Sequence, residues 1–404
     1  MGKILNRYKK IVGSEKIKEI EKRAKPLKGK YILHINATYY GGGVAEILDN
    51  LVVLMNDVGI NACWSIIKGS EPFFEITKTF HNGTQGYPIK LTKEVKATYE
   101  ELCRRNSVYI NFCGADAVIA HDPQVLPLIK YARPDRKKEP WVWRIHTDIT
   151  QPDPDLWNYL KTFIKNYNEM VVSDEKYLKD DIGLKQTIIM PSIDPLSKKN
   201  RDLSDKQARK ILKDAGIDLK KPMICQISRY DRWKDQVGVV EAFKRIKKEV
   251  DCQLVLLGNY ATDDPEGAAY YKKTKAKAKG LKDIKVIADK GASPLLVNAL
   301  QKMSEVVIQK SLREGFGLTV SEALWKRTPV VAGNVGGIPS QIKHGENGFL
   351  VNSVKQCAEK TIELLKDDKL RKKMGKNGRE YVRENFLITR HLLDYLELLN
   401  RIIK

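Results

Sequence analysis

The stretch "KYILHINATYYGGGVAEILDNLVVLMNDVG", residues 30–59, decides the fold class of this chain. It opens with an apolar run typical of a buried strand, and three consecutive glycines, Gly41, Gly42 and Gly43, then interrupt the chain. Over residues 44–58 apolar side chains recur at the helical period. A strand, a glycine turn and an amphipathic helix in this order form half of a βαβ unit, so the stretch predicts an α/β fold with parallel strands.

Apolar runs and helical stretches alternate in the same way along nearly the whole chain, as is typical of parallel sheets covered by helices. Further strands are expected in the first half at residues 62–69, 117–122, 141–147, 169–174 and 187–192. In the second half they are expected at residues 222–231, 252–259, 284–290, 304–311 and 328–334, each followed by a helical segment.

A polar segment at residues 190–207 interrupts this rhythm near the middle of the chain. With 404 residues the chain exceeds what one hydrophobic core usually holds. We therefore predict an N-terminal domain of residues 1–195 and a C-terminal domain of residues 196–385. The last stretch, about residues 386–404, has the pattern of a helix with one apolar face, and we expect it to pack back on the N-terminal domain.

Composition limits the classes of function. Lys and Arg number 72 against 50 Asp and Glu, a formal charge of +22 that favours an anionic partner. The basic residues are spread over helical stretches and form none of the known nucleic-acid modules, so no nucleic-acid partner is expected. No apolar run reaches membrane-spanning length and the start lacks a signal peptide, so we expect a cytoplasmic protein without a stable membrane anchor. The six cysteines show no CxxC pair and suggest neither disulfides nor a zinc site.

Ligands of open parallel sheets bind beyond the carboxyl ends of the strands, and several motifs fall there. The glycines at 41–43 precede a helix, where they suit either a structural turn or a loop that lets the backbone approach a phosphate. After the first strand of the second half, Arg229, Arg232 and Lys234 form a basic cluster that is either solvent-facing or able to bind a diphosphate.

A later strand end of the second half carries "SLREGFGLTVSEAL", residues 311–324, in which seven residues separate Glu314 from Glu322. Thr319 and Glu322 match a capping box, which would explain Glu322 structurally. In a functional reading, the backbone amides at Gly317 and Leu318 would meet phosphate oxygens while the two carboxylates accept hydrogen bonds from sugar and ribose hydroxyls.

These motifs carry a family resemblance. "REGFGLTVSEAL" resembles the E-x7-E motif of retaining glycosyltransferases with the GT-B fold, and "SRYDRWKD" looks like the phosphate-binding Arg and Lys of that family. "PVVAGNVGGIPSQIKHGENGFLV" resembles the segment that follows the glutamates there. "LHINATYYGGGVAEIL", "AHDPQ" and "WVWRIHTDIT" look like the trehalose glycosyltransferring synthases, a GT4-like group. The resemblance implies two Rossmann-like, doubly wound domains that face each other across a cleft.

The resemblance also implies roles for individual residues. The catalytic group would be Glu314, Arg229, Lys234 and His121. The donor-binding group would be Gly41, Gly42, Gly43, Gly317, Leu318, Thr319 and Glu322. Acceptor contacts would come from Tyr39, Asp122, His146 and Asp148.

The implied reaction moves glucose from ADP-, UDP- or GDP-glucose to free glucose with retention of configuration, giving trehalose and a nucleoside diphosphate. The sequence leaves open the direction of the reaction, the preferred nucleotide base and whether the chain forms a homodimer. No cofactor or protein-bound metal is required, because side-chain cations already face the diphosphate, although a Mg ion can assist.

Three alternatives remain open at this point. A trehalose phosphorylase of the same fold would use inorganic phosphate in place of a nucleotide. A retaining transferase with another sugar or a lipid acceptor would bind a membrane surface, for which the basic N-terminal segment, residues 4–25 and expected to be one helix, is a candidate. A noncatalytic binder of nucleotide sugars would be stabilised by its ligand without turning it over.

Overall fold

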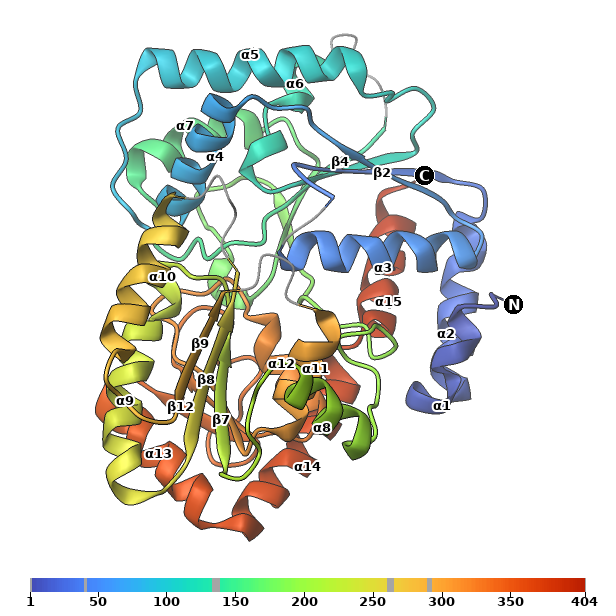
Figure 1. Cartoon of the computed structure of the whole chain (residues 1–404). Coiled ribbons are helices and arrows are strands. Elements are labelled where there is room, and N and C mark those ends of the chain that lie inside the picture. Colours follow the sequence, from blue (N-terminus) through green and yellow to red (C-terminus); the bar gives the residue numbers. More distant parts are fainter. Residues whose placement is uncertain (1, 40–41, 133–138, 260–264, 289–292, 404) are drawn as a thin grey trace. The chain divides into compact units, whose positions relative to one another are not determined.

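The computed structural model describes residues 2–39, 42–132, 139–259, 265–288 and 293–403 (Figure 1). Internal contacts divide the chain into two compact units. The N-terminal unit comprises Met1–Ser192 together with Ile388–Lys404, and the C-terminal unit comprises Ile193–Leu387. The last helix of the chain thus belongs to the unit that contains the first.

The N-terminal unit is built on a six-stranded parallel sheet of order β2-β1-β3-β4-β5-β6. Its strands are β1 (Tyr31–Asn36), β2 (Asn61–Ile66), β3 (Ala117–His121), β4 (Trp141–Arg144), β5 (Glu169–Val172) and β6 (Lys185–Ile188). Short, almost wholly buried strands such as β3 and β4 are what a sheet covered on both faces requires.

Helices and 3-10 turns surround this sheet. They are η1 (Leu5–Tyr8), α1 (Lys9–Val12), α2 (Ser14–Ala24), η2 (Lys25–Leu27), α3 (Gly43–Asp57), α4 (Glu71–Thr84), α5 (Lys93–Tyr109), η3 (Pro123–Val125), α6 (Leu128–Ala132), α7 (Pro154–Ile164), η4 (Glu175–Tyr177) and α15 (Ile388–Ile402). In Figure 1, α15 (red) lies beside α3 (blue), and it also contacts α2.

The expectation of one unbroken N-terminal helix is wrong. Gly13 adopts a φ of 85°, in the left-handed region that glycine tolerates best, and separates α1 from α2. No helix in the described part of the chain is long and apolar enough to cross a membrane.

The C-terminal unit holds a second six-stranded parallel sheet, of order β12-β11-β10-β7-β8-β9. Its strands are β7 (Met223–Ile227), β8 (Gln253–Gly258), β9 (Ile284–Ala288), β10 (Val306–Gln309), β11 (Val330–Gly333) and β12 (Gly348–Val351). Its helices are α8 (Asp205–Asp214), η5 (Arg232–Lys234), α9 (Gln236–Glu249), α10 (Pro265–Ala278), α11 (Pro294–Met303), α12 (Leu318–Trp325), α13 (Val354–Lys366) and α14 (Asp368–Asn385).

Two details of this unit differ from the sequence-based expectation. The four-residue strand β12 was not expected, because it begins at Gly348 and lacks a strand pattern of its own. The segment between β11 and β12 forms turns instead of the expected helix.

Both sheets are doubly wound, which confirms the predicted fold class. The order of the C-terminal sheet is the Rossmann order, and its direction of growth reverses between β7 and β10. In the N-terminal sheet the reversal lies between β1 and β3. Loops diverge at such a switch point and leave a crevice at the carboxyl ends of the two strands, where ligands bind.

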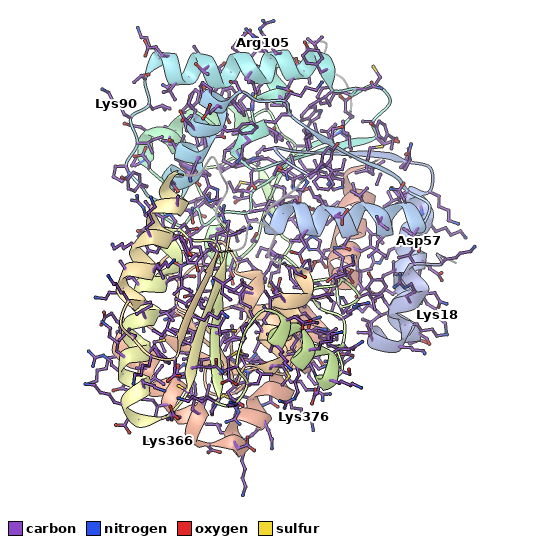
Figure 2. The ribbon with its side chains drawn as sticks, in the orientation of Figure 1. Lys18, Asp57, Lys90, Arg105, Lys366 and Lys376 are labelled. Carbon is purple, nitrogen blue, oxygen red and sulfur yellow. The ribbon has the colours of Figure 1, made fainter. Side chains whose placement is uncertain are left out.

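Basic side chains cover the helix surfaces, as the composition suggested. Figure 2 shows Lys18 on α2 and Lys366 and Lys376 on the C-terminal unit extending away from the ribbon. All three are exposed, so much of the positive charge is solvated.

Candidate active site

The switch point of the C-terminal sheet brings together two motifs that are far apart in sequence. Arg229 and Lys234 follow β7, and Glu314 follows the adjacent strand β10. Lys234 Nζ lies 2.8 Å from Glu314 Oε1 and 2.7 Å from Glu314 Oε2. The sequence-predicted catalytic residues of this unit are therefore neighbours in the structure.

Glu314 is held by several donors at once. Besides Lys234, its Oε2 accepts hydrogen bonds from Gln309 Nε2 at 3.3 Å and from Ser311 Oγ at 3.1 Å. The Glu314 and Lys234 side chains are only 10% and 14% exposed. The ammonium group and the two hydrogen bonds fix the orientation of this buried carboxylate.

A second buried ion pair, between Lys310 and Asp235, adjoins the first in sequence. Asp235 also caps α9 by accepting a hydrogen bond from Gly238 N at 3.0 Å, at a left-handed backbone conformation with φ of 50°. Gln226 Nε2 on β7 donates to Lys234 O at 2.7 Å and fixes the backbone between the two pairs. Sequence reasoning missed Lys310, although its place directly after a buried strand was a usable signal.

Arg229 differs from these paired groups. Its side chain is 60% exposed, and its guanidinium lies 3.9 Å from the carboxylate of Asp231. Asp231 is itself used to cap η5, where it accepts from the Trp233 and Lys234 amides. The cationic charge of Arg229 is thus accessible to an anion at the switch point.

Helix α12 begins beside Glu314. Gly317 is its N-cap with a φ of 83°, and a Cβ there would lie 3.1 Å from Glu314 Cγ. Glycine therefore satisfies both the backbone conformation and the close approach of the carboxylate. The amides of Leu318 and Thr319 precede the first intrahelical bond, so they point out of the helix start, where an anion is stabilised.

The capping box expected of Thr319 and Glu322 is wrong. Thr319 lies inside α12 and its hydroxyl donates to Ile227 O at 3.2 Å, while the N-cap Gly317 has no side chain to cap with. Glu322 instead faces inward. Its Oε1 lies 3.2 Å from Lys199 Nζ and its Oε2 accepts from Gln301 Nε2 at 2.9 Å.

Burial raises the pKa of Glu322, but the charges of Lys199 and Lys326 and the Gln301 hydrogen bond outweigh it, so its pKa lies below the usual value. Glu322 is therefore a buried carboxylate kept ionised by its neighbours. Neither Lys199 nor Gln301 was expected from the sequence.

In the N-terminal unit, three histidines form a chain across the switch point. His34 Nδ1 lies 3.1 Å from His121 Nε2, and His121 Nδ1 lies 3.0 Å from His146 Nε2. The rings stack with centroids 5.4 Å and 5.3 Å apart. Both ring nitrogens of His121 are thus engaged, and His146, which is partly exposed, forms the outer end of the chain.

Burial removes the charge from this chain. It lowers the pKa of His34 to about 3 and lowers the pKa of His121 and of His146 well below the ordinary value. A neutral imidazole has one donor and one acceptor nitrogen, so the tautomer of each ring determines that of the next. His34 was missed from the sequence, where its signal was a polar residue inside the buried strand β1.

Buried polar groups on neighbouring elements surround the histidine chain. Burial raises the pKa of Asp122 to about 6, although its Oδ1 accepts a hydrogen bond from His146 N at 2.8 Å. Arg144, fully buried at the end of β4, donates through Nη2 to Ile189 O at 2.7 Å and lowers the pKa of His121 and of His146 by its charge. His391 on α15 lies 2.8 Å from Met190 O through Nδ1. Sequence reasoning missed both Arg144 and His391.

The remaining predicted residues of this unit are less concentrated. Tyr39 is 41% exposed and donates to Trp64 O at 3.0 Å. Asp148 is buried and accepts from both the amide and the hydroxyl of Thr150, at 2.9 and 2.6 Å. Gly42 caps α3 with a φ of 85°, Gly43 begins that helix, and Gly41 lies outside the described residues.

Among the residues that the structure describes, no group of three or more His, Cys, Asp or Glu side chains is arranged to hold a metal ion. The charges at the C-terminal switch point are ammonium, guanidinium and carboxylate groups. The chemistry that these residues can supply is therefore anion binding and hydroxyl binding.

Comparisons with known proteins match the chain to two families. Residues 34–179 match the family described as "Trehalose synthase, N-terminal domain", and residues 207–381 match "Glycosyl transferases group 1". The chain is similar in structure to a UDP-forming alpha,alpha-trehalose-phosphate synthase from Burkholderia xenovorans, with a TM-score of 0.75 at 15% identity over 93% of this chain and 100% of that one. The fold and the family matches together define a glycosyltransferase with the GT-B fold.

Full-length relatives narrow the class. The chain is 44% identical to a trehalose synthase from Thermococcus litoralis over 99% of its own length and 97% of that protein. It therefore belongs to the trehalose synthase family. A trehalose phosphorylase from Grifola frondosa is more distant, at 29% identity over 94% of this chain and 58% of that protein.

Proposed function

We propose that this protein is a retaining hexosyltransferase that moves glucose from a nucleotide-glucose donor to free glucose, giving trehalose and a nucleoside diphosphate. The observation that carries the proposal is the ion pair between Lys234 and Glu314 at the switch point of the C-terminal sheet. It places a cation for a diphosphate and an oriented carboxylate for sugar hydroxyls next to each other. Membership of the trehalose synthase family supports the choice of product.

The donor is assigned to the C-terminal unit. Arg229, Lys234 and the amides at the start of α12 bind the diphosphate, and each charged hydrogen bond is worth about 1.5–3 kcal/mol. Lys234 then shares its three donors between Glu314 and phosphate oxygens. Glu314 accepts from hydroxyls of the glucosyl group, and Glu322 accepts from the ribose through the lone pairs that Lys199 and Gln301 leave open.

The acceptor glucose is assigned to the N-terminal unit. Its hydroxyls need hydrogen-bond donors and acceptors, which the histidine chain, Asp122 and Asp148 supply, with Tyr39 close to the same strand ends in sequence. His146 is the partly exposed end of the chain, so it makes the contact with substrate more directly than His121 does.

Transfer with retention requires attack on the face from which the phosphate leaves. The bond from the anomeric carbon to the diphosphate oxygen breaks, and its electron pair stays on the diphosphate. The acceptor hydroxyl oxygen then bonds to the anomeric carbon, and its proton passes to the departing phosphate oxygen. The protein residues stabilise the charge that develops on that oxygen and orient both sugars, and no cofactor is needed. A Mg ion bound to the diphosphate can assist.

The proposal is tested by incubating the purified chain with ADP-, UDP- or GDP-glucose, each with and without glucose, and following products by proton NMR. An alpha,alpha-linked disaccharide that forms only with glucose, together with nucleoside diphosphate, is the expected result. Hydrolysis of the donor without trehalose would refute the acceptor assignment, and no turnover of any donor would refute the function.

A second candidate, trehalose phosphorolysis, is favoured by the similarity to the Grifola frondosa phosphorylase over 94% of this chain. It would use inorganic phosphate where the synthase uses a nucleotide. Trehalose is therefore also incubated with phosphate alone and with each nucleoside diphosphate. Glucose 1-phosphate formed without a nucleotide would establish this second function.

A further inference from the structure

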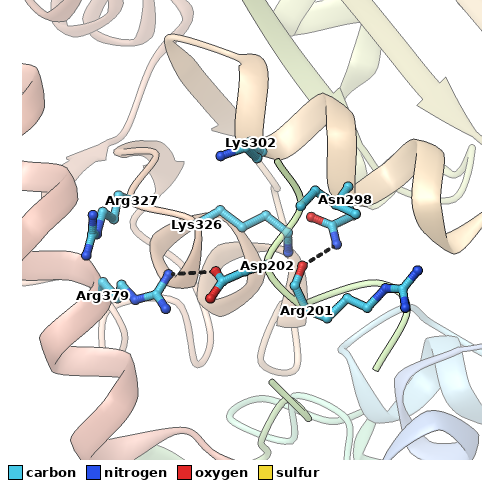
Figure 3. A pocket seen from close by; sticks show the side chains of 8 residues that line it. Arg201, Asp202, Asn298, Lys302, Lys326, Arg327 and Arg379 are labelled. Carbon is cyan, nitrogen blue, oxygen red and sulfur yellow. Dashed lines mark hydrogen bonds and ion pairs between the residues drawn. The ribbon is translucent and has the colours of Figure 1, made fainter. Parts of the chain in front are cut away.

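A separate basic pocket lies in the C-terminal unit (Figure 3). It encloses about 300 Å³, a volume suited to a small molecule. Its cationic lining residues are Arg201, Lys302, Lys326, Arg327 and Arg379, and its one acidic residue is Asp202. They come from the loop before α8, from α11, from the end of α12 and from α14.

The pocket lies at the edge of the sheet opposite the candidate donor site. Helices α11 and α12 return from the carboxyl ends of β9 and β10, so Lys302, in the last turn of α11, and Lys326, the C-cap of α12, approach the amino edge. Arg327 stands three residues before β11 begins at Val330. The diphosphate-binding part of the donor site uses the first turn of α12, whereas the pocket is lined by Lys326 and Arg327 just beyond its last residue, Trp325, and Glu322 lies between the two.

The walls of the pocket are fixed by buried polar contacts. Asn298 Nδ2 donates to Lys198 O at 3.1 Å and to Arg201 O at 2.8 Å, which ties the loop to α11. Trp325 Nε1 donates to Asn200 O at 3.1 Å and ties the same loop to α12. Asn298 and Trp325 are almost fully buried, so the pocket is formed before any ligand arrives.

Three of the cationic lining residues, Arg379, Lys326 and Lys302, make contacts within the protein. Arg379 Nη1 contacts Asp202 Oδ1 at 3.3 Å and Trp325 O at 3.1 Å, and Lys326 Nζ lies 3.2 Å from Glu322 O. These contacts satisfy the carbonyl end of α12, whose partial negative charge would otherwise repel an anion. Lys302 pairs with Asp205 at 2.9 Å.

Arg201 and Arg327 remain as exposed cations on opposite sides of the group in Figure 3. Among the described residues, no carboxylate pairs with either of them.

Arg327 also occupies an unusual backbone position. Its φ is 63°, and the other described non-glycine residues with positive φ are all aspartates, which tolerate this region better. The peptide oxygen of Arg327 packs so closely on α14 that a Cβ at Gly375 would lie 2.0 Å from it. The fold thus holds a guanidinium at a strained position on the rim of a basic pocket, where Asn or Gly would fit the backbone at lower cost.

We propose that this pocket binds a small phosphorylated anion at a site distinct from the donor site. Arg201 and Arg327 supply planar guanidinium donors for phosphate oxygens, and Lys326 and Lys302 add positive charge between them. Asp202 and Asn298 offer acceptors for hydroxyl groups on the same ligand.

The test is calorimetric titration of the full chain with inorganic pyrophosphate at fixed, low ionic strength, since surface charge is strongly screened by salt. The pocket variant is Arg201→Gln/Arg327→Asn, which removes two charges and keeps a residue that tolerates positive φ at position 327. The matched control is Lys366→Gln/Lys376→Gln, which removes two exposed charges elsewhere on the same unit (Figure 2). Lys234→Met removes a cation of the donor site, so it distinguishes binding in the pocket from binding at the donor site. Thermal unfolding checks that every variant is folded.

Wild type, the lysine control and Lys234→Met are each expected to bind pyrophosphate in the pocket, with the same affinity. The pocket variant should bind pyrophosphate about a hundredfold more weakly, about tenfold for each arginine removed. Equal binding by the pocket variant and wild type would overturn the inference, and so would an equal loss in the lysine control. Because binding is measured without turnover, the result does not depend on the proposed function.

Discussion

The two switch points bury polar groups in opposite ways. In the C-terminal unit, Lys234 and Glu314 are buried as an ion pair, with 2.7 Å between Nζ and Oε2. In the N-terminal unit, burial leaves the imidazoles of His34, His121 and His146 neutral. A charged, compensated network suits a charged diphosphate, whereas a neutral chain suits the hydroxyls of an uncharged sugar. The difference between the two sites follows from whether a buried group has a counter-charge beside it.

Removing the carboxylate should have the largest effect. Glu314→Gln keeps the shape of the side chain but loses its charge, so the proposed hydrogen bonds from donor-sugar hydroxyls should weaken and transfer should fall about a thousandfold. Initial rates of nucleoside diphosphate release measure this. Nucleoside diphosphate binding should persist, and near-normal turnover would rule out the role of Glu314.

Loss of one partner of a buried ion pair also destabilises the fold, by about 3–5 kcal/mol. The double variant Lys234→Met/Glu314→Gln leaves no unpaired charge, so it should be more stable to urea than Glu314→Gln alone. It should be no more active. Recovered stability together with recovered activity would show that Glu314 acts only through folding.

Removing the cation of Lys234 should have the next largest effect at the switch point of the C-terminal sheet. Lys234→Met should weaken binding of a nucleoside diphosphate about a hundredfold, because a charged hydrogen bond to phosphate is lost. Binding of the free nucleoside should change little. Calorimetry with both ligands makes the comparison, and an equal loss for both would place Lys234 away from the phosphates.

The histidine chain predicts a smaller effect. His34→Asn preserves a hydrogen-bonding group near His121 but no longer sets its tautomer, so transfer should fall about tenfold. The fall should appear mainly in KM for glucose, and nitrogen NMR of His121 and His146 should report altered tautomers. Unchanged tautomers with the same loss of activity would indicate a merely structural role for His34.

The pH dependence of stability tests the neutral histidine chain without measuring activity. Below the ordinary histidine pKa of 6.5, the unfolded chain binds a proton that folded His34, with a pKa of about 3, does not. The free energy of unfolding therefore falls with falling pH by about 1.4 kcal/mol per unit for this residue. Urea titrations between these pH values should show a shallower fall in His34→Asn.

Asp122 contributes with the opposite sign. Its folded pKa of about 6 lies above the value of 3.8 for the free side chain, so its stabilising contribution is present at low pH and is lost as the pH rises through 6. An Asp122→Asn variant, which cannot titrate, should lose stability more steeply than wild type as the pH falls from 6 to 4. An identical slope would show that Asp122 is not buried in solution as it is in the structure.

Sequence alone could predict the fold because the period of apolar residues changes between strands and helices in both halves. It could also bring Arg229, Lys234 and Glu314 together, since parallel strands of one sheet end at the same edge. It could not find the residues that hold Glu314, Asp235 and Glu322 in place. Lys310, Gln309 and Lys199 carry no motif, and their roles arise only from strand order and helix packing.

The sequence predicted only part of the histidine chain, because only residues that follow strand ends could be placed at the edge of the sheet. His121 and His146 follow strand ends, but His34 lies within a strand, and the pattern of that strand reports burial, not contacts. The capping box failed because Thr319 finds a carbonyl on the neighbouring strand β7, a partner that spacing along the chain does not reveal.

The return of α15 to the N-terminal unit has a consequence for how the protein is made. His391 and Tyr395 on α15 lie against groups of the first sheet, with the rings of Tyr395 and His34 5.9 Å apart. Translation delivers α15 only after the whole of the C-terminal unit. The N-terminal unit therefore stays incomplete until the unit that follows it in sequence has been synthesised.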